Sequence, residues 1–503
     1  MASPALKSVS RWAHMVAIGG TGMGALAALL QDQGWCVTGS DGPLYPPMSL
    51  FLAKRGLLLK DSYKAENLLG GAWGLSNPKP DLVIIGNAIS RGNVEAEATE
   101  QAGLKKMSFP QALAEFCIRD RRSFVVAGTH GKTTTTSIMT WAFESLGRNP
   151  GFLIGGIPLN FGQGCRSGEG PVFVTEGDEY DTAYWDKESK FLHYRPSWVL
   201  CTGIEFDHAD IFKNVEAIEM SFEKLAGLTK EGWVLVDDSS SPRAASVKRV
   251  ADFCARRGLV CHRYGTQADS RFRLVEAVAA PSPQNPEVRG TKMSLLVPEL
   301  GHIELFSPMT GFHNALNVAG VIATLLASGE VKSVPQLQKF LDGFLGVKRR
   351  QEEVYTSSRL IVIDDFAHHP TAIRETIKAI RSRYPQRKLA AFFEPRSATS
   401  GRNILADEFA ACFDDADAVF LVTPTKTNIP AAEKLNVPEL LEKASHRPHN
   451  VGKTFVWKET IPELAQAFAD WKSKAGSGIL ALVMSNGPFG GLHGMLADAD
   501  KRV

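Results

Sequence analysis

The fold of this chain is decided by the segment Ser123-Phe-Val-Val-Ala-Gly128-Thr-His-Gly131-Lys132-Thr133-Thr134. Its apolar start predicts a buried strand over 124–127, and the pattern over 137–146 predicts a helix soon afterwards. A strand that delivers Gly-Lys-Thr to the start of a helix is a phosphate cradle, because backbone N–H groups and the lysine meet phosphate oxygens while the threonine hydroxyl meets Mg²⁺. The sequence therefore predicts an α/β fold that binds nucleotide phosphates through Gly128, Thr129, His130, Gly131, Lys132, Thr133 and Thr134.

The loop departs from the full phosphate-binding pattern at one position. Where that pattern has a glycine, Val126 stands, so the loop reads G-x-x-G-K-T and is shorter than that of motor or GTPase proteins. Because strand, loop and helix agree, the phosphate cradle is favoured over a chance match.

Acidic residues follow the next predicted strands. Glu176 ends the strand over 172–175 and opens Glu-Gly-Asp-Glu-Tyr-Asp, and His208 follows the strand over 199–202. The carboxyl ends of parallel strands meet at one edge of a sheet, where ligands bind in open α/β folds. Carboxylate, hydroxyl and imidazole groups there suit one or two Mg²⁺ ions. The sequence predicts Thr133, Glu176 and His208 as metal ligands; a solvated strand end and a structural histidine are the alternatives.

A second glycine-rich loop lies near the N-terminus. Gly20-Thr-Gly22-Met-Gly24-Ala25 stands between a predicted strand and a predicted helix, and Asp41 follows about twenty residues later. Glycines allow the backbone to approach a pyrophosphate at a helix N-terminus, and the acid takes a ribose hydroxyl. This pattern fits a UDP-sugar as well as NAD, and a tight turn without a ligand remains an alternative.

The pattern of the remaining sequence predicts how the chain is divided into domains. Short apolar runs alternate with amphipathic helix-length segments along 503 residues, which is typical of parallel sheets and at this length indicates about three domains. We expect a Rossmann-like N-terminal domain, a central P-loop ATPase-like α/β domain and a C-terminal Rossmann-like domain, over 1–119, 120–347 and 348–503. The third contains predicted strands at 360–363, 389–393, 418–422 and 479–483, and predicted helices near 371–383, 402–413 and 460–474.

Composition excludes several classes of protein. With 44% hydrophobic and 22% charged residues, the chain is neither disordered nor fibrous. A net charge of +2 provides no field for general binding to nucleic acid or membranes, and no apolar run is long enough to span a bilayer. Seven scattered cysteines without C-x-x-C indicate neither a disulfide framework nor a cysteine zinc site, so we expect a cytoplasmic protein. The histidines at 368 and 369 also lack a third zinc ligand, so a nucleotide or substrate contact is favoured there.

The motifs together resemble one family. Gly128-Thr-His-Gly-Lys-Thr-Thr134, Glu176, Asp207-His208 and His313-Asn-Ala-Leu-Asn317, in this order, are similar to the Mur ligases, the ATP-dependent amide-forming enzymes of peptidoglycan synthesis. The resemblance covers essentially the whole chain. It implies that ATP phosphorylates the lactyl carboxylate of UDP-N-acetylmuramate and that an amine then attacks the acyl phosphate, with Mg²⁺ as cofactor and ATP as co-substrate.

Longer runs narrow the expectation within the family. The runs at 45–49, 84–89, 178–181, 205–212, 364–371 and 484–491 resemble members that join the tripeptide L-Ala-γ-D-Glu-meso-diaminopimelate to UDP-N-acetylmuramate in peptidoglycan recycling. The alternative is a member that adds L-alanine to the same nucleotide. The expected partners are UDP-N-acetylmuramate, ATP and the muramyl tripeptide, with no nucleic acid or membrane, and the expected state is a monomer or weak homodimer.

The resemblance also implies roles for single residues. Lys132, Glu176 and His208 are expected in catalysis, and Gly20, Thr21, Gly22, Met23, Gly24 and Asp41 in binding the UDP-sugar. On ATP, adenine-side contacts are expected from His313, Asn314 and Asn317, a phosphate contact from Arg350 and a ribose contact from Asp365. Arg396, in Glu-Pro-Arg-Ser after a third-domain strand, is expected to meet a peptide carboxylate; a domain-interface ion pair is the alternative.

Two other classes of protein fit parts of the sequence. An NAD-dependent dehydrogenase would use Gly20 to Asp41 but leaves the loop at 128–134 unexplained. A P-loop switch or binding module fits poorly with the shortened loop and the separate sugar-nucleotide loop.

Overall fold

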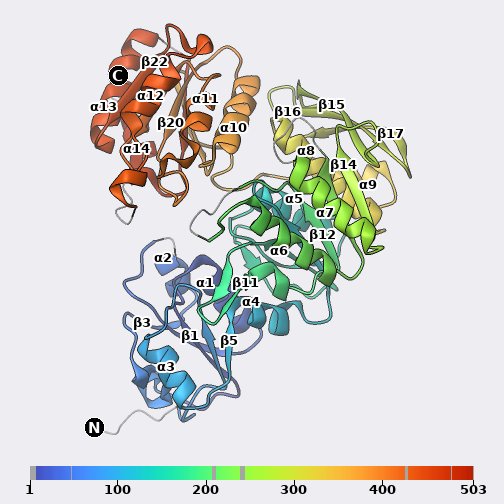
Figure 1. Cartoon of the computed structure of the whole chain (residues 1–503), viewed down its shortest axis with the longest axis vertical. Coiled ribbons are helices and arrows are strands. Elements are labelled where there is room, and N and C mark those ends of the chain that lie inside the picture. The colour runs from blue at the N-terminus through green and yellow to red at the C-terminus, as the bar shows by residue number, and fades with distance from the viewer. Residues whose placement is uncertain are drawn as a thin grey trace. The chain divides into compact units, whose positions relative to one another are not determined.

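The computed structural model describes residues 7–46, 48–206, 211–237, 244–424, 429–476 and 478–501 (Figure 1). The chain divides into two compact units. Unit 1 comprises Met1–Glu205, Glu216–Arg271 and Gly320–Lys332, and unit 2 comprises Phe206–Val215, Phe272–Ala319 and Ser333–Val503.

The first sheet of unit 1 is wholly parallel, with strand order β3-β2-β1-β4-β5. Its strands are β1 (Trp12–Val16), β2 (Cys36–Ser40), β3 (Leu58–Lys60), β4 (Leu82–Ile85) and β5 (Lys106–Ser108). Its helical segments are α1 (Thr21–Asp32), α2 (Met48–Lys54), α3 (Val94–Gln101), α4 (Phe109–Ala112) and a π-helical turn over Leu113–Ile118. Helix α1 buries every residue from Met23 to Leu30, because small and apolar side chains occupy all of its positions there.

The second sheet of unit 1 contains the strand that the Gly-Lys-Thr segment predicted. Strand β6 (Arg122–Ala127) lies between β9 (Val172–Gly177) and β12 (Trp198–Cys201) and is parallel to both. The order along this part of the sheet is β14-β13-β12-β6-β9-β7-β8. The other strands are β7 (Gly151–Leu153), β8 (Cys165–Arg166), β13 (Gly232–Asp237) and β14 (Cys261–Gly265), and the helices are α5 (Lys132–Ser145), α6 (Val215–Leu228) and α7 (Ala244–Arg256).

A separate two-stranded hairpin follows β9. It consists of β10 (Asp181–Ala183) and β11 (Asp186–Ser189), paired antiparallel with Asp181 opposite Ser189. The acidic run that the sequence placed after β9 therefore leads directly into this hairpin.

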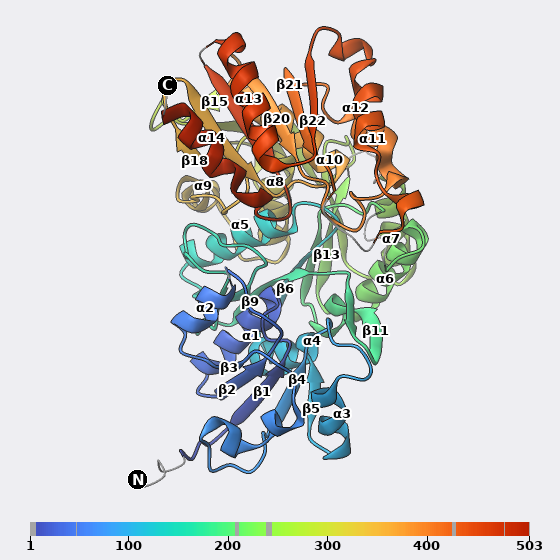
Figure 2. The same ribbon diagram turned by 90° about the vertical axis from the view of Figure 1, so that its left-hand side faces the viewer.

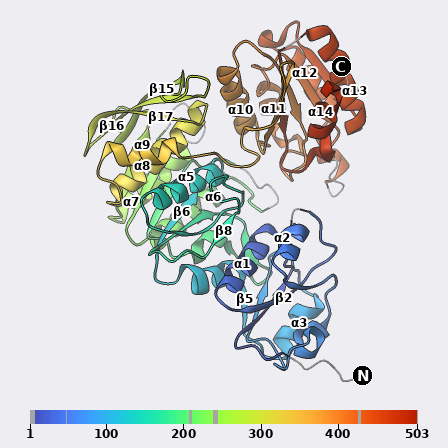
Figure 3. The ribbon, with the colours of Figure 1, turned by 180° about the vertical axis from the view of Figure 1, so that it is seen from behind.

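Unit 2 contains an antiparallel sheet that the sequence did not predict. Strands β15 (Phe272–Pro281), β16 (Arg289–Val297) and β17 (Gly301–Ser307) pair in sequence order (Figure 3). Helices α8 (Phe312–Ala327) and α9 (Val334–Asp342) follow, and α8 carries the chain from unit 2 into unit 1. Strand β15 is exposed along most of its second half, so its residues show no run of buried positions that would reveal a strand.

The C-terminal sheet of unit 2 has the order β18-β19-β23-β20-β21-β22, with only β18 antiparallel to its neighbour. Its strands are β18 (Glu352–Thr356), β19 (Leu360–Asp365), β20 (Lys388–Phe393), β21 (Ala418–Val422), β22 (Thr454–Lys458) and β23 (Ile479–Met484). Its helices are α10 (Pro370–Arg383), α11 (Ala406–Ala411), α12 (Val437–Ser445), α13 (Ile461–Ala475) and α14 (Leu492–Lys501).

Helices cover both faces of this sheet, and each face has its own core. Ile361 and Ile363 of β19 lie with α10, α11 and α12, whereas Leu360 and Val362 lie with α13 and α14. Figure 2 shows β20, β21 and β22 between these two groups of helices. Because successive side chains of a strand point to opposite faces, a strand buried on both faces is apolar throughout, which is how β19 could be recognised in the sequence.

The predicted α/β class with three domains is confirmed, and the predicted strands lie within or within two residues of the observed ones. The helix predicted near 402–413 is shorter than expected: a 3₁₀ turn over Asn403–Leu405 precedes α11. In the described part of the chain, no helix has both the length and the apolar character needed to cross a membrane.

Candidate active site

The phosphate loop lies where the carboxyl ends of β6, β9 and β12 meet. It joins β6 to α5, and its two glycines have left-handed backbone angles, with φ +130° at Gly128 and +81° at Gly131. A Cβ atom at Gly128 would lie 2.5 Å from Oγ1 of Thr202 and 2.8 Å from the carbonyl oxygen of Gly203. Glycine is therefore required at position 128, both because of the backbone conformation and because a Cβ atom would have no room there.

Helix α5 begins at Lys132, directly after Gly131, and no side chain caps its first turn. The N–H groups of such a turn have no partner inside the helix, so they suit an anion. Thr133 and Thr134 are buried in this turn. The start of α5 therefore lies where the sequence predicts the phosphate cradle, and binding of phosphate there stays a prediction.

The Lys132 ammonium is held on two sides. It donates to the carbonyl oxygen of Gly128 at 2.7 Å and to Oε2 and Oε1 of Glu179 at 2.9 and 3.2 Å. The side chains of Lys132 and Glu179 are only 15% and 2% exposed. Burial alone would lower the pKa of Lys132, but the neighbouring carboxylates of Glu179 and Asp178 outweigh it and raise that pKa, so the lysine is a cation.

Two of the three predicted metal ligands lie together. The Thr133 hydroxyl donates to Oε2 of Glu176 at 3.1 Å, and Oε1 of Glu176 accepts the N–H of Gly155 at 2.7 Å. A hydroxyl and a carboxylate beside the start of a helix are the hard oxygen donors that Mg²⁺ prefers, so these residues fit the predicted ion. The third predicted ligand, His208, lies outside the described residues.

The end of β12 fixes the rest of the loop. The backbone N–H of Glu205 donates to Oγ1 of Thr129 at 2.8 Å, and the Thr202 hydroxyl donates to the carbonyl oxygen of His130 at 2.5 Å. Nε2 of His130 lies 3.4 Å from Oε2 of Glu205. Thr129 and His130 therefore shape the loop through contacts with the neighbouring strand.

The N-terminal glycine-rich loop also leads into a helix N-terminus. Gly20 directly precedes α1, whereas Gly22 and Gly24 lie inside its first turn. A Cβ at Gly22 would lie 3.3 Å from the ring of Phe109, and one at Gly24 would collide with Met48 of α2. These two glycines therefore permit close packing around α1, while the exposed start of the helix at Gly20 and Thr21 suits a diphosphate.

Asp41, directly after β2, accepts three hydrogen bonds through its carboxylate. Oδ2 accepts the N–H of Gly19 at 2.6 Å, and Oδ1 accepts the N–H of Gly42 at 2.7 Å and the Tyr63 hydroxyl at 2.9 Å. The carboxylate thus holds the glycine-rich loop in shape. Its predicted contact with a ribose stays a prediction.

In unit 2, the predicted adenine and ribose residues form one network. Asn317 donates to Oδ1 of Asn314 at 3.3 Å, and Asn314 donates to the carbonyl oxygen of Thr310 at 2.9 Å. Gln351 lies 3.4 Å from Nε2 of His313, and its backbone N–H donates to Oδ2 of Asp365 at 2.8 Å. Gln351 therefore links the two groups, which the sequence reasoning missed because a lone glutamine has no recognisable spacing.

The arginines before β18 have different surroundings. The guanidinium group of Arg350 lies 4.8 Å from the ring centre of Phe366. Arg349, which was not predicted, contacts Asp364 at 3.1 Å and donates to the carbonyl oxygens of Ser485 and Gly487 at 2.7 and 2.6 Å. Arg349 thus ties the loop after β23 to the end of β19.

Arg396 lies on the loop that follows β20, beside the loop after β23. Its side chain is exposed and rests against Gly487, where an added Cβ would collide with the guanidinium group. Among the residues that the structure describes, no carboxylate pairs with Arg396 in the recorded ion pairs. The guanidinium group is therefore available for a carboxylate ligand.

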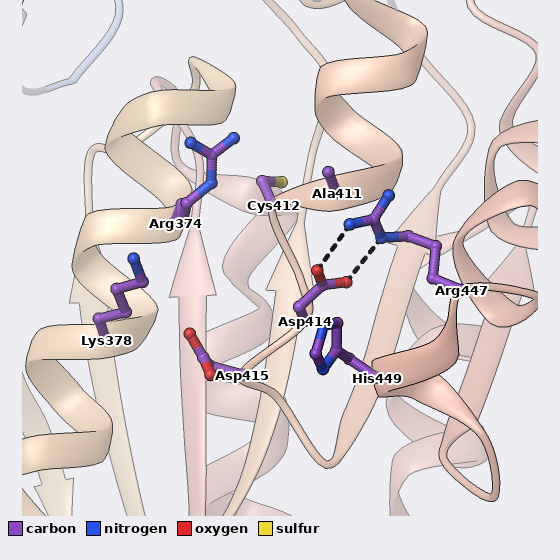
Figure 4. A pocket seen from close by; sticks show the side chains of 8 residues that line it. All are labelled: Arg374, Lys378, Ala411, Cys412, Asp414, Asp415, Arg447 and His449. Atoms are coloured by element: carbon purple, nitrogen blue, oxygen red, sulfur yellow. Dashed lines mark hydrogen bonds and ion pairs between the residues drawn. The ribbon is translucent and has the colours of Figure 1, made fainter. Parts of the chain in front are cut away.

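Unit 2 contains a hollow on the part of the C-terminal sheet where the parallel strands begin. It lies beside Asp414 and Asp415, which precede β21 and so stand at the opposite edge of the sheet from Arg396. Figure 4 shows the two-fold contact between Asp414 and Arg447, whose distances are 2.9 and 2.8 Å. None of the predicted site residues lines this hollow.

Three family models match the chain. They are described as the Mur ligase family catalytic domain over residues 13–121, the Mur ligase middle domain over 126–325, and the Mur ligase glutamate ligase domain over 349–487.

Individual relatives match along nearly the whole chain. A UDP-N-acetylmuramate–L-alanyl-γ-D-glutamyl-meso-2,6-diaminoheptandioate ligase of Escherichia coli K12 is 37% identical over 96% of this chain and 97% of its own length. A UDP-N-acetylmuramate–L-alanine ligase of Mycobacterium marinum is 34% identical over 81% of this chain and 80% of its own length. A crystal structure of a murein peptide ligase from Psychrobacter arcticus 273-4 is 29% identical, with a TM-score of 0.66 over 98% of this chain and 99% of that one.

Proposed function

The chain belongs to the Mur ligase family, and from this membership we propose that it joins L-alanyl-γ-D-glutamyl-meso-diaminopimelate to the lactyl carboxylate of UDP-N-acetylmuramate. It is an ATP-dependent ligase that forms an amide bond. The proposal rests chiefly on one observation: two relatives named for this reaction match 96% of the chain at 37% and 34% identity, whereas relatives named as L-alanine ligases match 81–91% of it at 31–34% identity. The cluster of Lys132, Thr133 and Glu176 supplies the groups that such a reaction needs.

The proposed reaction has two steps. A lactyl carboxylate oxygen attacks the γ-phosphorus of ATP, the bond to the bridging oxygen breaks, and ADP leaves. The free amine of the tripeptide then attacks the acyl phosphate, and phosphate leaves as the C–N bond forms and the amine loses a proton. Both steps depend on neutralising charge on phosphoryl oxygens, which Lys132 and the N–H groups at the start of α5 do in this chain.

Thr133 and Glu176 are the described residues that would hold Mg²⁺, and we propose His208 as a further ligand. Bound there, the ion would supply positive charge to the phosphate oxygens. Gly155 fixes one carboxylate oxygen of Glu176 through its N–H, so the other oxygen faces Thr133.

The other ligands are assigned by position. We propose that Gly20 to Gly24 and Asp41 bind the UDP part of the sugar nucleotide. His313, Asn314, Asn317, Arg350 and Asp365 would contact ATP, and Gln351 supports this group through its bonds to His313 and Asp365. The division into domains at 1–119, 120–347 and 348–503 belongs to the same proposal, as do a cytoplasmic location and a monomer or weak homodimer.

Substrate choice tests the proposal directly. We expect the purified protein to release ADP from ATP only when UDP-N-acetylmuramate and the tripeptide are both present, because the acyl phosphate needs an acceptor amine. Release should be at least about tenfold slower with L-alanine in place of the tripeptide, since binding groups that reach the longer peptide are lost. Equal rates with L-alanine would instead support the L-alanine-adding reaction, and ADP release without the sugar nucleotide would contradict both.

Arg396 provides a second test, of peptide recognition. We expect Arg396→Lys to raise the KM for the tripeptide about tenfold while the KM for ATP is unchanged, because a lysine cannot make the two-fold contact that guanidinium makes with a carboxylate. Arg402→Lys is a matched control, since Arg402 pairs with Glu433 at 3.0 Å in the same domain. An unchanged KM for the tripeptide in the Arg396 variant would remove this assignment.

A further inference from the structure

Glu179 lies in the acidic run after β9, and its buried carboxylate accepts a hydrogen bond from the Lys132 ammonium. We propose that Glu179 is a positioning residue that aims the Lys132 ammonium into the phosphate loop. This inference rests on the proposed function in one respect: the proposed function identifies the bound phosphates as those of ATP.

The donor count of Lys132 supports this role. A lysine ammonium has three N–H donors. In the described part of the chain, its partners are the carbonyl oxygen of Gly128 at 2.7 Å and the carboxylate of Glu179 at 2.9 Å. These two acceptors come from different elements, the loop after β6 and the segment after β9. Together with the second oxygen of Glu179 at 3.2 Å, they engage the three donors and fix the direction of the ammonium group.

Burial makes this contact strong. The Glu179 side chain is 2% exposed, so water does not compete effectively for its carboxylate. The other acidic groups near Lys132 have partners of their own. Asp178 pairs with Lys190 at 3.2 Å, and Glu176 accepts from Thr133 and Gly155. Glu179 is thus the carboxylate that directly contacts Lys132.

The segment that carries Glu179 is anchored at both ends. Before it, β9 is a strand of the sheet beside β6. After it, the hairpin of β10 and β11 contacts helix α3 and strand β5 of unit 1: the Tyr184 hydroxyl donates to Glu100 of α3 at 2.8 Å, and the ammonium of Lys106 in β5 lies 4.7 Å from the ring centre of Trp185. With both ends fixed, the Glu179 carboxylate has a defined position from which it can orient Lys132.

A double-mutant cycle on the full chain tests the role. ATP affinity is measured by calorimetry for the wild type, Glu179→Gln, Lys132→Met and the double variant. We expect Glu179→Gln to weaken ATP binding about ten- to hundredfold, which corresponds to the loss of a charge-assisted hydrogen bond. In the Lys132→Met background the same change should have no further effect, because Glu179 acts through the lysine. Equal losses in both backgrounds would indicate a merely structural role and overturn the inference.

The chain offers a matched control. Lys472 and Asp500 form another buried lysine–carboxylate pair in unit 2, with side chains 14% and 1% exposed. Asp500→Asn removes a similar buried charge, yet it should leave ATP affinity unchanged; an equal loss of affinity would show that the effect is not specific to Lys132. If Glu179→Gln does not fold, Glu179→Asp serves instead, since it keeps the charge but shortens the reach, and wild-type affinity in that variant would count against positioning.

The outcomes also separate this inference from the proposed function. A non-additive cycle in a protein that makes no amide would support the role of Glu179 and refute the ligation. An additive cycle in an active ligase would refute the role of Glu179 alone.

Discussion

Lys132→Met is expected to lower the rate of ADP release at saturating substrates by at least about a thousandfold, which corresponds to about 4 kcal/mol of lost transition-state stabilisation. The lysine is the described cation directly at the phosphate loop, and phosphoryl transfer gains most of its catalysis from positioning and charge neutralisation. Initial rates with ATP, UDP-N-acetylmuramate and tripeptide measure the effect. A variant with more than a tenth of the wild-type rate would contradict the cradle role.

The same substitution should also lower stability. Without the lysine, the Glu179 carboxylate, which is 2% exposed, loses the ammonium that it contacts, and breaking a buried ion pair by removing one partner costs about 3–5 kcal/mol. The double variant Lys132→Met with Glu179→Gln removes both charges, so it should regain most of the lost stability and none of the activity. Thermal unfolding of the two variants separates catalytic loss from unfolding. Wild-type stability of Lys132→Met would show that the contact with Lys132 does not stabilise the fold.

Glu176→Gln is expected to have the second-largest effect, a fall in kcat of about a hundred- to thousandfold, together with a higher Mg²⁺ concentration for half-maximal activity. The substitution keeps the shape and one oxygen but removes the charge that a divalent ion requires. Titration of activity with MgCl₂ measures both effects.

Thr133 supplies the matched controls for this prediction. Thr133→Ser keeps the hydroxyl and should stay active, whereas Thr133→Val keeps the shape and should lose activity as Glu176→Gln does. An unchanged Mg²⁺ requirement in Glu176→Gln would mean that this carboxylate is not a ligand and only orients Thr133 and Gly155.

The phosphate loop could be recognised from the sequence because its chemistry is local. Gly128, Gly131 and Lys132 act within a few residues of one another, and the backbone angles at both glycines follow from the tight path between β6 and α5. Glu176 could be placed near them because parallel strands end at one edge of a sheet. The pairing of Lys132 with Glu179 could not be predicted, because it depends on how the segment after β9 turns into the hairpin.

Other parts of the candidate site also needed the structure. The sequence predicts Gly22 and Gly24 as UDP-sugar contacts, and their surroundings add that both also allow α1 to pack against Phe109 and Met48. The link that Gln351 makes between His313 and Asp365 joins residues 52 positions apart in the chain, as the numbering shows. Neither hydrophobic periodicity nor a sequence motif predicts a contact between residues so far apart in the chain.

The sequence by itself determined the α/β class, the buried strands, the phosphate loop and the family, because each depends on hydrophobic patterning or on residues a few positions apart. Only the tertiary structure decided which acid holds Lys132, which residue joins the adenine and ribose groups, and that β15 to β17 form an antiparallel sheet. These features arise from long-range packing and pairing, where the free energy depends on how whole elements meet and not on the local order of residues.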